Sequence, residues 1–358
     1  MRNISRAERI HCGMPTLSVV LIVKNEQSNL CRLLPTLGFA DEVVVCDTGS
    51  ADDSVAVARG YGAKVCRFKW RDDFAAARNY ALSHATCQYV MWLDADDFLP
   101  TRTRNFLTKW KQTPAENCAD TYFMRYVCRA DNSFRYWRER LLRNCSQCRF
   151  KGFIHEAIVP FGQTQTLDVD VVHFGGNDHS ARNLRIYLAA KEQGRRFYVR
   201  DNYYFARTLV DNGRTDDALP LFRRCAANKR LSVAERVDCL LFVARHYLSV
   251  NDTAGAARTL ARVLRIAPPD PRVCCAMGDI AFASKDYNCA VQWYKLATHA
   301  EFCGGFVDTM YKTFIPYMQL AVCLWYAGDK QQAKLYYLQA AAIQPTHPTV
   351  TANKKYFA

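Results

Sequence analysis

The sequence lacks two features that would place the protein in a membrane or on a secretion route. No apolar run among its 358 residues approaches the roughly 18 residues that a membrane-spanning helix needs. Residues 1–15 are basic and polar, without the apolar core of a secretory signal. We therefore expect a cytoplasmic protein with no transmembrane segment.

A dense disulfide framework is also missing. The 16 cysteines are scattered, and several fall in expected core segments, so reduced thiols are the better interpretation. Cys145 and Cys148 form a lone C-x-x-C, and no second pair stands at zinc-ribbon spacing. The hydrophobic fraction of 50% excludes a disordered chain, and the length fits two domains with separate cores.

What is present begins with an apolar run at residues 89–93 that stops on Asp94, Asp96 and Asp97. Desolvating carboxylates costs several kcal/mol unless positive charge neutralises them, so an Asp-x-Asp at the end of a core strand suggests a divalent cation or a clustered base. Acidic turns after strands are common, however, and the tripeptide alone also fits an ordinary turn.

The surrounding pattern predicts an α/β domain. Apolar, β-branched runs at residues 17–23, 42–46, 63–68 and 89–93 alternate with segments of helical spacing at 28–37, 52–60 and 73–85. Such alternation is typical of a parallel sheet covered on both faces. Ligands bind beyond the carboxyl ends of these strands, where Glu26, Asp47 and the acids at 94–97 fall.

Six motifs carry a family resemblance. They are VKNE at 23–26, DTGS at 47–50, DDFAAARN at 72–79, WLDAD at 92–96, RLLRN at 140–144 leading to FKGFIHE at 150–156, and VHFGG at 172–176. Together they resemble family 2 glycosyltransferases of the GT-A fold. They are also similar to a subgroup in which helical repeats follow the transferase, including sublancin-type peptide S-glycosyltransferases.

The resemblance implies an inverting transferase that uses a nucleotide sugar, expected to be a UDP-sugar, with Mg²⁺ or Mn²⁺. The metal ligands would be Asp94, Asp96 and His173, with Asp96 as the direct ligand and Asp94 nearer the ribose or a metal-bound water. A satisfied histidine at a strand end is the alternative for His173. The residues expected to bind the donor are Val23, Asn25, Glu26, Asp47, Gly49, Arg78, Asp94 and Ala95.

Three of these donor-site residues have structural alternatives. Asp47, expected at the nucleobase or ribose, could cap the next helix. Arg78 would face the diphosphate or clamp the Asp-x-Asp, or it could be a surface charge on an Ala-rich helix. Glu26 could be only a first-turn acid favoured by the helix dipole.

An inverting transfer also needs a base that takes the acceptor's proton. Glu156 is the candidate and His155 the second choice, because both fall in the half of the domain that contributes the acceptor side in the resembled enzymes. Glu156 could instead pair with Arg143 or Lys151.

From about residue 183 an internal repeat emerges. Small residues at Ala206, Ala244, Gly278 and Ala321 each stand seven before a turn residue and twelve before an alanine, and a large residue follows that alanine four later. The turn residues are Gly213, Asn251, Lys285 and Gly328; the alanines are Ala218, Ala256, Ala290 and Ala333; the large residues are Phe222, Leu260, Tyr294 and Tyr337. This pattern resembles the tetratricopeptide repeat, with an insertion around 303–313.

The expected architecture is therefore an N-terminal tail at 1–14, a mostly parallel, Rossmann-like GT-A domain at 15–182 and an all-α tetratricopeptide-like domain at 183–358. Residues 183–358 hold 24 Lys and Arg against 14 Asp and Glu, so the repeats are the basic part. Their concave face could hold an acidic acceptor, a nucleic acid or an anionic surface, or be a solvated face without a partner.

The acceptor is therefore expected to be a protein, a peptide or a glycan, with nucleic acid as an alternative, and the repeats could also form a dimer. An inactive transferase-fold scaffold that binds a protein partner is the remaining hypothesis.

Overall fold

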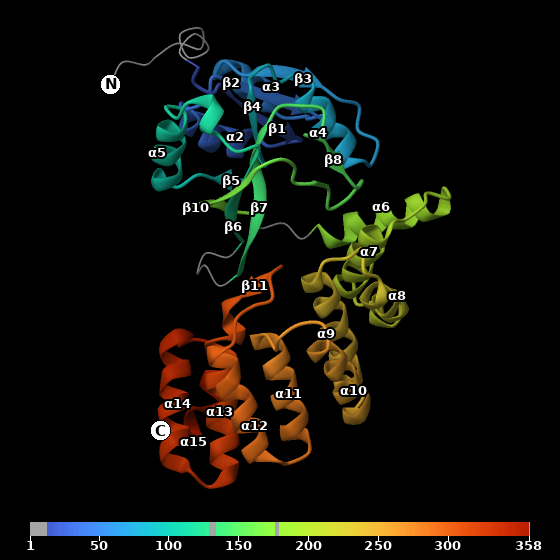
Figure 1. Cartoon of the computed structure of the whole chain (residues 1–358), viewed down its shortest axis with the longest axis vertical. Coiled ribbons are helices and arrows are strands. Elements are labelled where there is room, and N and C mark those ends of the chain that lie inside the picture. Colours follow the sequence, from blue (N-terminus) through green and yellow to red (C-terminus); the bar gives the residue numbers. More distant parts are fainter. Residues whose placement is uncertain (1–12, 129–133, 176–178, 358) are drawn as a thin grey trace. The chain divides into compact units, whose positions relative to one another are not determined.

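The computed structural model describes residues 13–128, 134–175 and 179–357. The chain divides into two units, Met1–Asp178 and His179–Ala358, each with its own set of helices or strands (Figure 1). Each unit is described by itself below. In the described ranges, no helix has both the length and the apolar character needed to cross a bilayer.

The first unit alternates strands and helices before its strands become consecutive. Its elements are β1 (Leu17–Val23), α2 (Gln27–Leu33), η1 (Leu34–Thr36), β2 (Glu42–Asp47), α3 (Ser54–Gly60), β3 (Lys64–Arg67), α4 (Phe74–Leu82), β4 (Tyr89–Leu93), β5 (Asp97–Phe98), α5 (Thr101–Trp110), η2 (Ala115–Asn117), β6 (Thr121–Val127), β7 (Phe134–Arg143), β8 (Phe150–Lys151), β9 (Ala157–Ile158) and β10 (Thr164–His173). The strands and helices predicted up to residue 93 are present, with ends that differ by a few residues.

The main sheet of this unit has the strand order β3-β2-β1-β4-β7-β6-β10-β5. The pairs from β3 to β4 are parallel, as predicted, whereas β4 pairs with β7, β7 with β6 and β10 with β5 in antiparallel fashion. The sheet is therefore mixed. Its antiparallel half contains the arginine-rich and aromatic-rich stretches at 125–127 and 134–143, which lie on the paired strands β6 and β7.

Helices cover both faces of the parallel half. Leu30, Ala58 and Trp110, from α2, α3 and α5, pack with one set of strand side chains that includes Leu21. On the other face, Ala81 of α4 belongs to a separate buried cluster with Val20, Trp92 and Phe150. Burial on both sides explains why β1 and β4 read as continuous apolar runs.

The carboxyl ends of β1, β2 and β4 lie at one edge of the sheet. β1 pairs with β2 on one side, where Val23 faces Asp47, and with β4 on the other, where Leu21 faces Leu93. The polar segments that follow these strands are therefore brought to the same edge, as the strand pattern predicted.

The second unit is built from helices, with one short strand. Its elements are α6 (Ser180–Glu192), α7 (Val199–Asp211), α8 (Thr215–Ala227), α9 (Val233–Ser249), α10 (Thr253–Leu264), α11 (Pro271–Ala283), α12 (Tyr287–His299), β11 (Val307–Asp308), η3 (Thr309–Tyr311), α13 (Phe314–Ala327), α14 (Lys330–Ile343) and α15 (Pro348–Phe357). Pairs of helices follow one another from α7 to α14, which confirms the predicted helical repeat.

The turn inside each pair has the backbone conformation that the repeat pattern requires. Gly213, Asn251, Lys285 and Gly328 all have a positive φ, between 60° and 92°. The next helix is then capped by an aspartate in three of the four pairs, since Asp252, Asp286 and Asp329 accept hydrogen bonds from the backbone three residues later. The small and large repeat residues named above are all buried.

Gly278 shows why a small residue is needed where two helices cross. A Cβ atom there would lie 2.7 Å from the ring of Tyr294 on the next helix. That ring is fully buried, and its hydroxyl donates a 2.7 Å hydrogen bond to Asp279, so it has little room to move.

We expect Gly278→Ala to destabilise the repeat unit by about 1–3 kcal/mol, because the added methyl group must displace Tyr294 or part the two helices. Calorimetry of the full chain measures the effect. Gly60→Ala serves as the matched control, since a Cβ at this helical glycine meets nothing within 4 Å. Equal melting curves for the two variants would contradict the packing argument.

Candidate active site

The acidic turn after β4 is held by a buried ion pair. Asp97 is fully buried and accepts hydrogen bonds from the backbone nitrogen of Asp94 at 2.9 Å and from the hydroxyl of Tyr126 at 2.9 Å. Arg140, on β7, is also fully buried and lies 3.1 Å from the Asp97 carboxylate. Asp97 therefore fixes the turn from inside rather than facing solvent.

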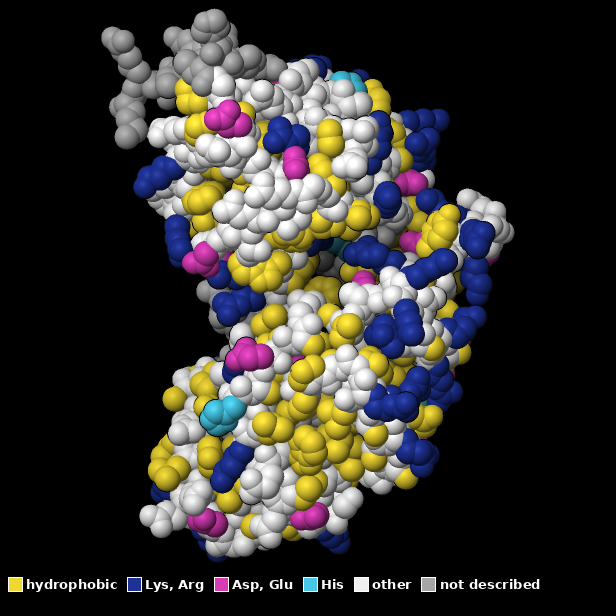
Figure 2. All heavy atoms as spheres, in the orientation of Figure 1, with side chains coloured by type: hydrophobic (Ala, Val, Ile, Leu, Met, Phe, Trp, Pro, Cys, Tyr) yellow, Lys and Arg dark blue, Asp and Glu magenta, His cyan; other side chains and the backbone are white. Residues whose placement is uncertain are grey.

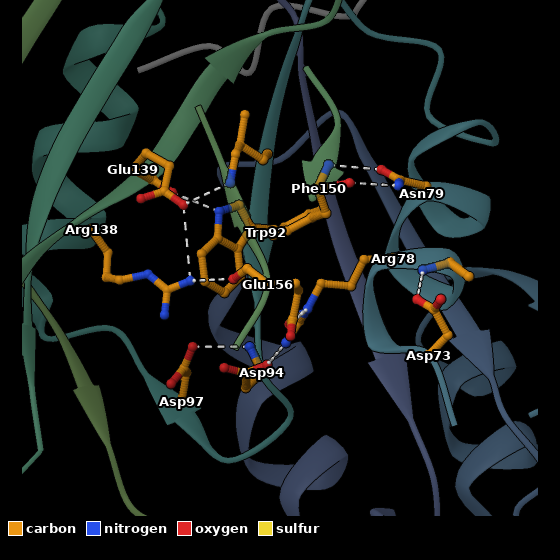
Figure 3. A network of polar contacts seen from close by, with 12 residues as sticks. Asp73, Arg78, Asn79, Trp92, Asp94, Asp97, Arg138, Glu139, Phe150 and Glu156 are labelled. Atoms are coloured by element: carbon orange, nitrogen blue, oxygen red, sulfur yellow. Dashed lines mark hydrogen bonds and ion pairs between the residues drawn. The ribbon is translucent and has the colours of Figure 1, made fainter. Parts of the chain in front are cut away.

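The guanidinium groups of three arginines lie close to the ring of Trp92. The guanidinium carbon lies 3.7 Å from the ring centroid for Arg140, 4.7 Å for Arg138 and 5.0 Å for Arg78. The indole nitrogen is satisfied by the backbone oxygen of Glu139 at 2.6 Å (Figure 3). Stacking on an aromatic face is one way in which a guanidinium tolerates burial.

Arg78 joins two carboxylates that are far apart in the sequence. Its Nη2 donates to Asp94 at 2.5 Å and its Nε donates to Glu156 at 2.6 Å (Figure 3). Burial alone would raise the pKa of Asp94, but the charges of Arg78 and Arg140 outweigh burial and hold this pKa well below its usual value. Glu156 is thus linked to Asp94 of the acidic turn through the guanidinium of Arg78.

The helix that carries Arg78 is positioned by its neighbours in the DDFAAARN segment. Asp73 caps α4 by accepting a hydrogen bond from the backbone of Ala76 at 2.8 Å. Asn79 exchanges two hydrogen bonds with the backbone of Phe150 on β8, at 2.9 and 3.0 Å. The same segment therefore sets the position of Arg78 and holds β8, the strand that precedes Glu156.

The candidate base lies in a segment with an unusual backbone. Gly152 and His155 both have positive φ, 88° and 52°, and the backbone oxygen of Phe153 accepts a hydrogen bond from Phe74 at the start of α4. Glu156 is 8% exposed and pairs with Arg78 rather than with Arg143 or Lys151. Arg143 instead pairs with Asp120 at 2.6 Å.

Asp96, Asp97 and His173 can each offer a ligand atom, with all three atoms within 4.8 Å of one another. His173 ends β10, beside Asp97 on β5 in the sheet register. Its Nδ1 lies 3.4 Å from Asp96 and 3.5 Å from Asp97, and it is buried without a hydrogen-bond partner among the described residues. Carboxylate and imidazole donors suit a divalent metal such as Mn²⁺, so the residues fit a metal site.

The two carboxylates that surround His173 favour a positive charge at this position. Burial lowers the pKa of His173, but Asp96 and Asp97 outweigh burial and raise it to about 10. Without a metal the imidazole is therefore a cation between two carboxylates. A metal ion bound to His173 would take the place of that proton.

The segment after His173 lies against the metal-site candidates. A Cβ atom on Gly175 would overlap the Nε2 of His173 and lie 3.0 Å from Asp96, so a larger residue there would displace the imidazole. Phe174 donates a backbone hydrogen bond to Asp96 at 3.0 Å, and its ring lies 4.8 Å from the guanidinium carbon of Arg32. Arg32, on α2, also donates to the backbone oxygen of Asp96 at 3.3 Å.

The predicted donor-binding residues at the ends of β1 and β2 form one connected loop pair. The backbone of Asn25 donates to the Ser50 hydroxyl at 2.9 Å, and the Asn25 side chain accepts from Ala51 at 2.7 Å. Asn25 and Gly49 have positive φ, 57° and 110°. Asp47 is 6% exposed and accepts a hydrogen bond from the backbone of Ser50 at 3.0 Å.

Three more of the predicted residues, Val23, Glu26 and Ala95, lie in the segments that follow or end strands at the same edge of the sheet. The backbone oxygen of Val23 accepts a hydrogen bond from Thr48. The Glu26 carboxylate accepts from Asn29 at 2.6 Å, and burial raises its pKa. Ala95 lies buried inside the acidic turn. The structure thus brings Val23, Asn25 and Glu26 together with Asp47 and Gly49.

Arg32 and Arg140 were missed by the sequence analysis as site residues. Glu26, Asn29 and Arg32 recur every three residues along α2, a spacing that places them on one helical face and could have pointed to Arg32. Arg140 lies in the RLLRN motif, but its burial against Asp97 depends on the pairing of β4 with β7, which no local pattern reveals.

Comparisons with known proteins agree with the motifs. Residues 18–182 match the family model "Glycosyl transferase family 2", and residues 316–347 match a tetratricopeptide repeat model. A TPR repeat-containing protein of Synechococcus elongatus is 34% identical over 151 residues, covering 41% of this chain and 36% of the relative. The SPbeta prophage-derived glycosyltransferase SunS of Bacillus subtilis is 23% identical over 183 residues, covering 48% of this chain and 42% of the relative.

The chain thus spans less than half the length of these relatives. Among solved structures, S. aureus TarS 1-349 is similar over 93% of both chains at 12% identity, with a TM-score of 0.37.

We expect Arg140→Met to destabilise the first unit by about 3–5 kcal/mol, because it leaves the buried carboxylate of Asp97 without its cation. Calorimetry of the full chain measures the loss. Arg102→Met is the control, since Arg102 pairs with Asp168 at 2.8 Å on an exposed surface and should change stability little. Similar losses in the two variants would contradict a special role for the buried pair.

Proposed function

Because residues 18–182 form a glycosyltransferase family 2 domain followed by tetratricopeptide-like repeats, we propose that this protein is a metal-assisted, inverting glycosyltransferase. Its donor would be a nucleotide sugar, with a UDP-sugar as the first choice, and the repeats would recruit the acceptor. The observation that carries the proposal is the site at the end of β4. There a cluster of possible metal ligands lies beside an arginine that joins Asp94 to Glu156.

The donor would lie across the carboxyl ends of β1, β2 and β4. Asp47, already fixed by Ser50, could accept a hydrogen bond from the uracil N3–H with its carboxylate. The connected loops at 23–26 and 47–50 would place the nucleoside, and Asp94 would face the ribose. This arrangement would put the diphosphate next to Asp96 and His173.

Asp96 and His173 would hold the metal, and Asp97 would keep both in place from its buried position. A divalent cation there would neutralise the negative charge that builds on the departing diphosphate. Gly175 packs directly against both ligands, so its segment limits how far they can move. Arg32 supports the same segment through Phe174 and the Asp96 backbone.

Glu156 would take the acceptor's proton as general base. Glu156 contacts the same edge of the Arg78 guanidinium as Asp94, which would keep a base beside the acidic turn where the acceptor would arrive. Arg78 would then hold both carboxylates at a fixed separation. His155 is the second candidate for the base, because it precedes Glu156 in the same segment.

We expect Asp96→Asn to abolish release of the nucleoside diphosphate from its donor while leaving the melting temperature near that of the wild type. Asp96 is partly exposed, and loss of one charge there removes a metal ligand without opening the core. A donor screen with Mn²⁺, read as released nucleoside diphosphate, comes first and begins with UDP-sugars.

Asp168→Asn is the matched control, since Asp168 is an exposed carboxylate paired only with surface arginines in the described structure. If the wild-type protein with Mn²⁺ neither binds nor hydrolyses any nucleotide sugar in the screen, the proposed activity is wrong.

For Glu156→Gln we expect kcat to fall about 10²–10⁴-fold with little change in the donor KM, because the amide keeps the shape of the side chain but cannot accept a proton. Steady-state kinetics on an identified acceptor measures this split. A melting curve taken in parallel reports whether the contact with Arg78 has been lost instead. Wild-type kcat in the glutamine variant would exclude Glu156 as the base and direct attention to His155.

A further inference from the structure

The cations of the repeat unit fall into two groups that differ in their pairing. On the first helices of the pairs, Arg207 of α7 and Arg272 of α11 both contact Asp238 of α9 at 3.2 Å. Arg272 also contacts the buried Asp270 at 2.6 Å. Positive charge on this side of the repeats is therefore largely neutralised by acids of the unit itself.

The second helices of the first two pairs, α8 and α10, carry cations along stretches that contain no acid; the acids of α8, Asp216 and Asp217, are confined to its first turn. Residues 218–231, on and just after α8, contain four cations and no Asp or Glu; residues 254–267, on and just after α10, contain three arginines and no Asp or Glu. We call these seven exposed side chains the basic face: Arg223, Arg224, Lys229, Arg230, Arg258, Arg262 and Arg265. None of them forms an ion pair with a described residue.

The basic face points away from the packed side of its helices. Arg258, Arg262 and Arg265 are spaced i, i+4 and i+7 and so share one side of α10, opposite the buried Ala256 and Leu260. Both α8 and α10 pack against α9. In Figure 2, Lys and Arg side chains gather over the region of α8 and α10.

Helix stability does not account for this composition. Cations in the last turn of a helix interact favourably with its dipole, which explains Arg224 and Arg262. It does not explain the absence of any acid from both stretches, since the neighbouring cations repel one another and an acid would relieve that repulsion. The pattern favours an anionic partner.

We propose that the basic face docks onto an anionic lipid surface. The cations occupy the outward sides of two helices that share one packing partner, so they form a two-dimensional array suited to a layer of headgroups. A site for single-stranded nucleic acid normally adds aromatic platforms for base stacking. In the two stretches the only aromatic residue is Phe222, and it is buried.

The proposal does not depend on the transferase activity. The cations contact the surface through charge alone, so binding should fall steeply as salt rises. Binding does not require that uncharged residues next to the basic face insert into the lipid. A catalytically inactive variant such as Asp96→Asn should therefore dock as well as the wild type.

Sedimentation of the full chain with lipid vesicles tests this proposal. We expect binding to vesicles of phosphatidylcholine with phosphatidylglycerol at low salt, and no binding to phosphatidylcholine alone. Arg258→Gln, Arg262→Gln and Arg265→Gln combined should weaken binding about a hundredfold, since each cation near an anionic surface contributes roughly a factor of five. These positions are exposed, and a melting curve checks that the variant is folded.

The control variant removes an equal number of positive charges from the first unit. Arg59→Gln, Lys69→Gln and Lys109→Gln combined alter three exposed cations there, and should leave vesicle binding close to that of the wild type. Equal losses in both triple variants would overturn a specific basic face, as would no binding to anionic vesicles at low salt. Binding of a labelled oligonucleotide that the α10 variant abolishes, without vesicle binding, would assign the face to nucleic acid instead.

Discussion

The site depends on the neutralisation of buried carboxylates by two arginines. The fully buried carboxylate of Asp97 is paired with Arg140, and Asp94 and Glu156 share the single guanidinium of Arg78. Because Arg78 comes from α4 and Arg140 from β7, the acidic turn is correctly shaped only when the helix and the antiparallel half of the sheet are both in place. Folding of the domain and assembly of the site are therefore one event.

Much of this arrangement could be predicted from the sequence. Parallel strands that end in polar segments place those segments at one edge, so Asp47 and the 94–97 acids were expected near the first strand's end. The repeats were equally predictable, because small residues such as Gly278 and left-handed turn residues such as Lys285 recur at fixed intervals. In both cases the signal is local or periodic.

The rest depends on contacts between distant segments. No local sequence pattern predicts whether the side chain of Asp97 is exposed or buried. In the structure it is fully buried beside Arg140. Pairing with Arg143 or Lys151 was the structural alternative for Glu156, which instead contacts Arg78, 78 residues earlier. Antiparallel pairing of β4 with β7 brings Arg140 to Asp97, whereas contacts of α4 with Phe150 and Phe153 bring Arg78 to Glu156. A segment so rich in alternating arginines and aromatics does not reveal which strand it will join.

The two units use arginine in opposite ways, which separates their physical roles. In the first unit, Arg78 and Arg140 are buried against Trp92 and paired with acids. These acids neutralise the positive charge, so its electrostatic field is weak outside the site. On α8 and α10 the arginines are exposed and unpaired by acids of the described structure, so their field extends into solvent. Catalysis needs the first kind of charge, because it must be fixed to within fractions of an ångström. Attraction of a partner needs the second kind, because it acts before contact is made.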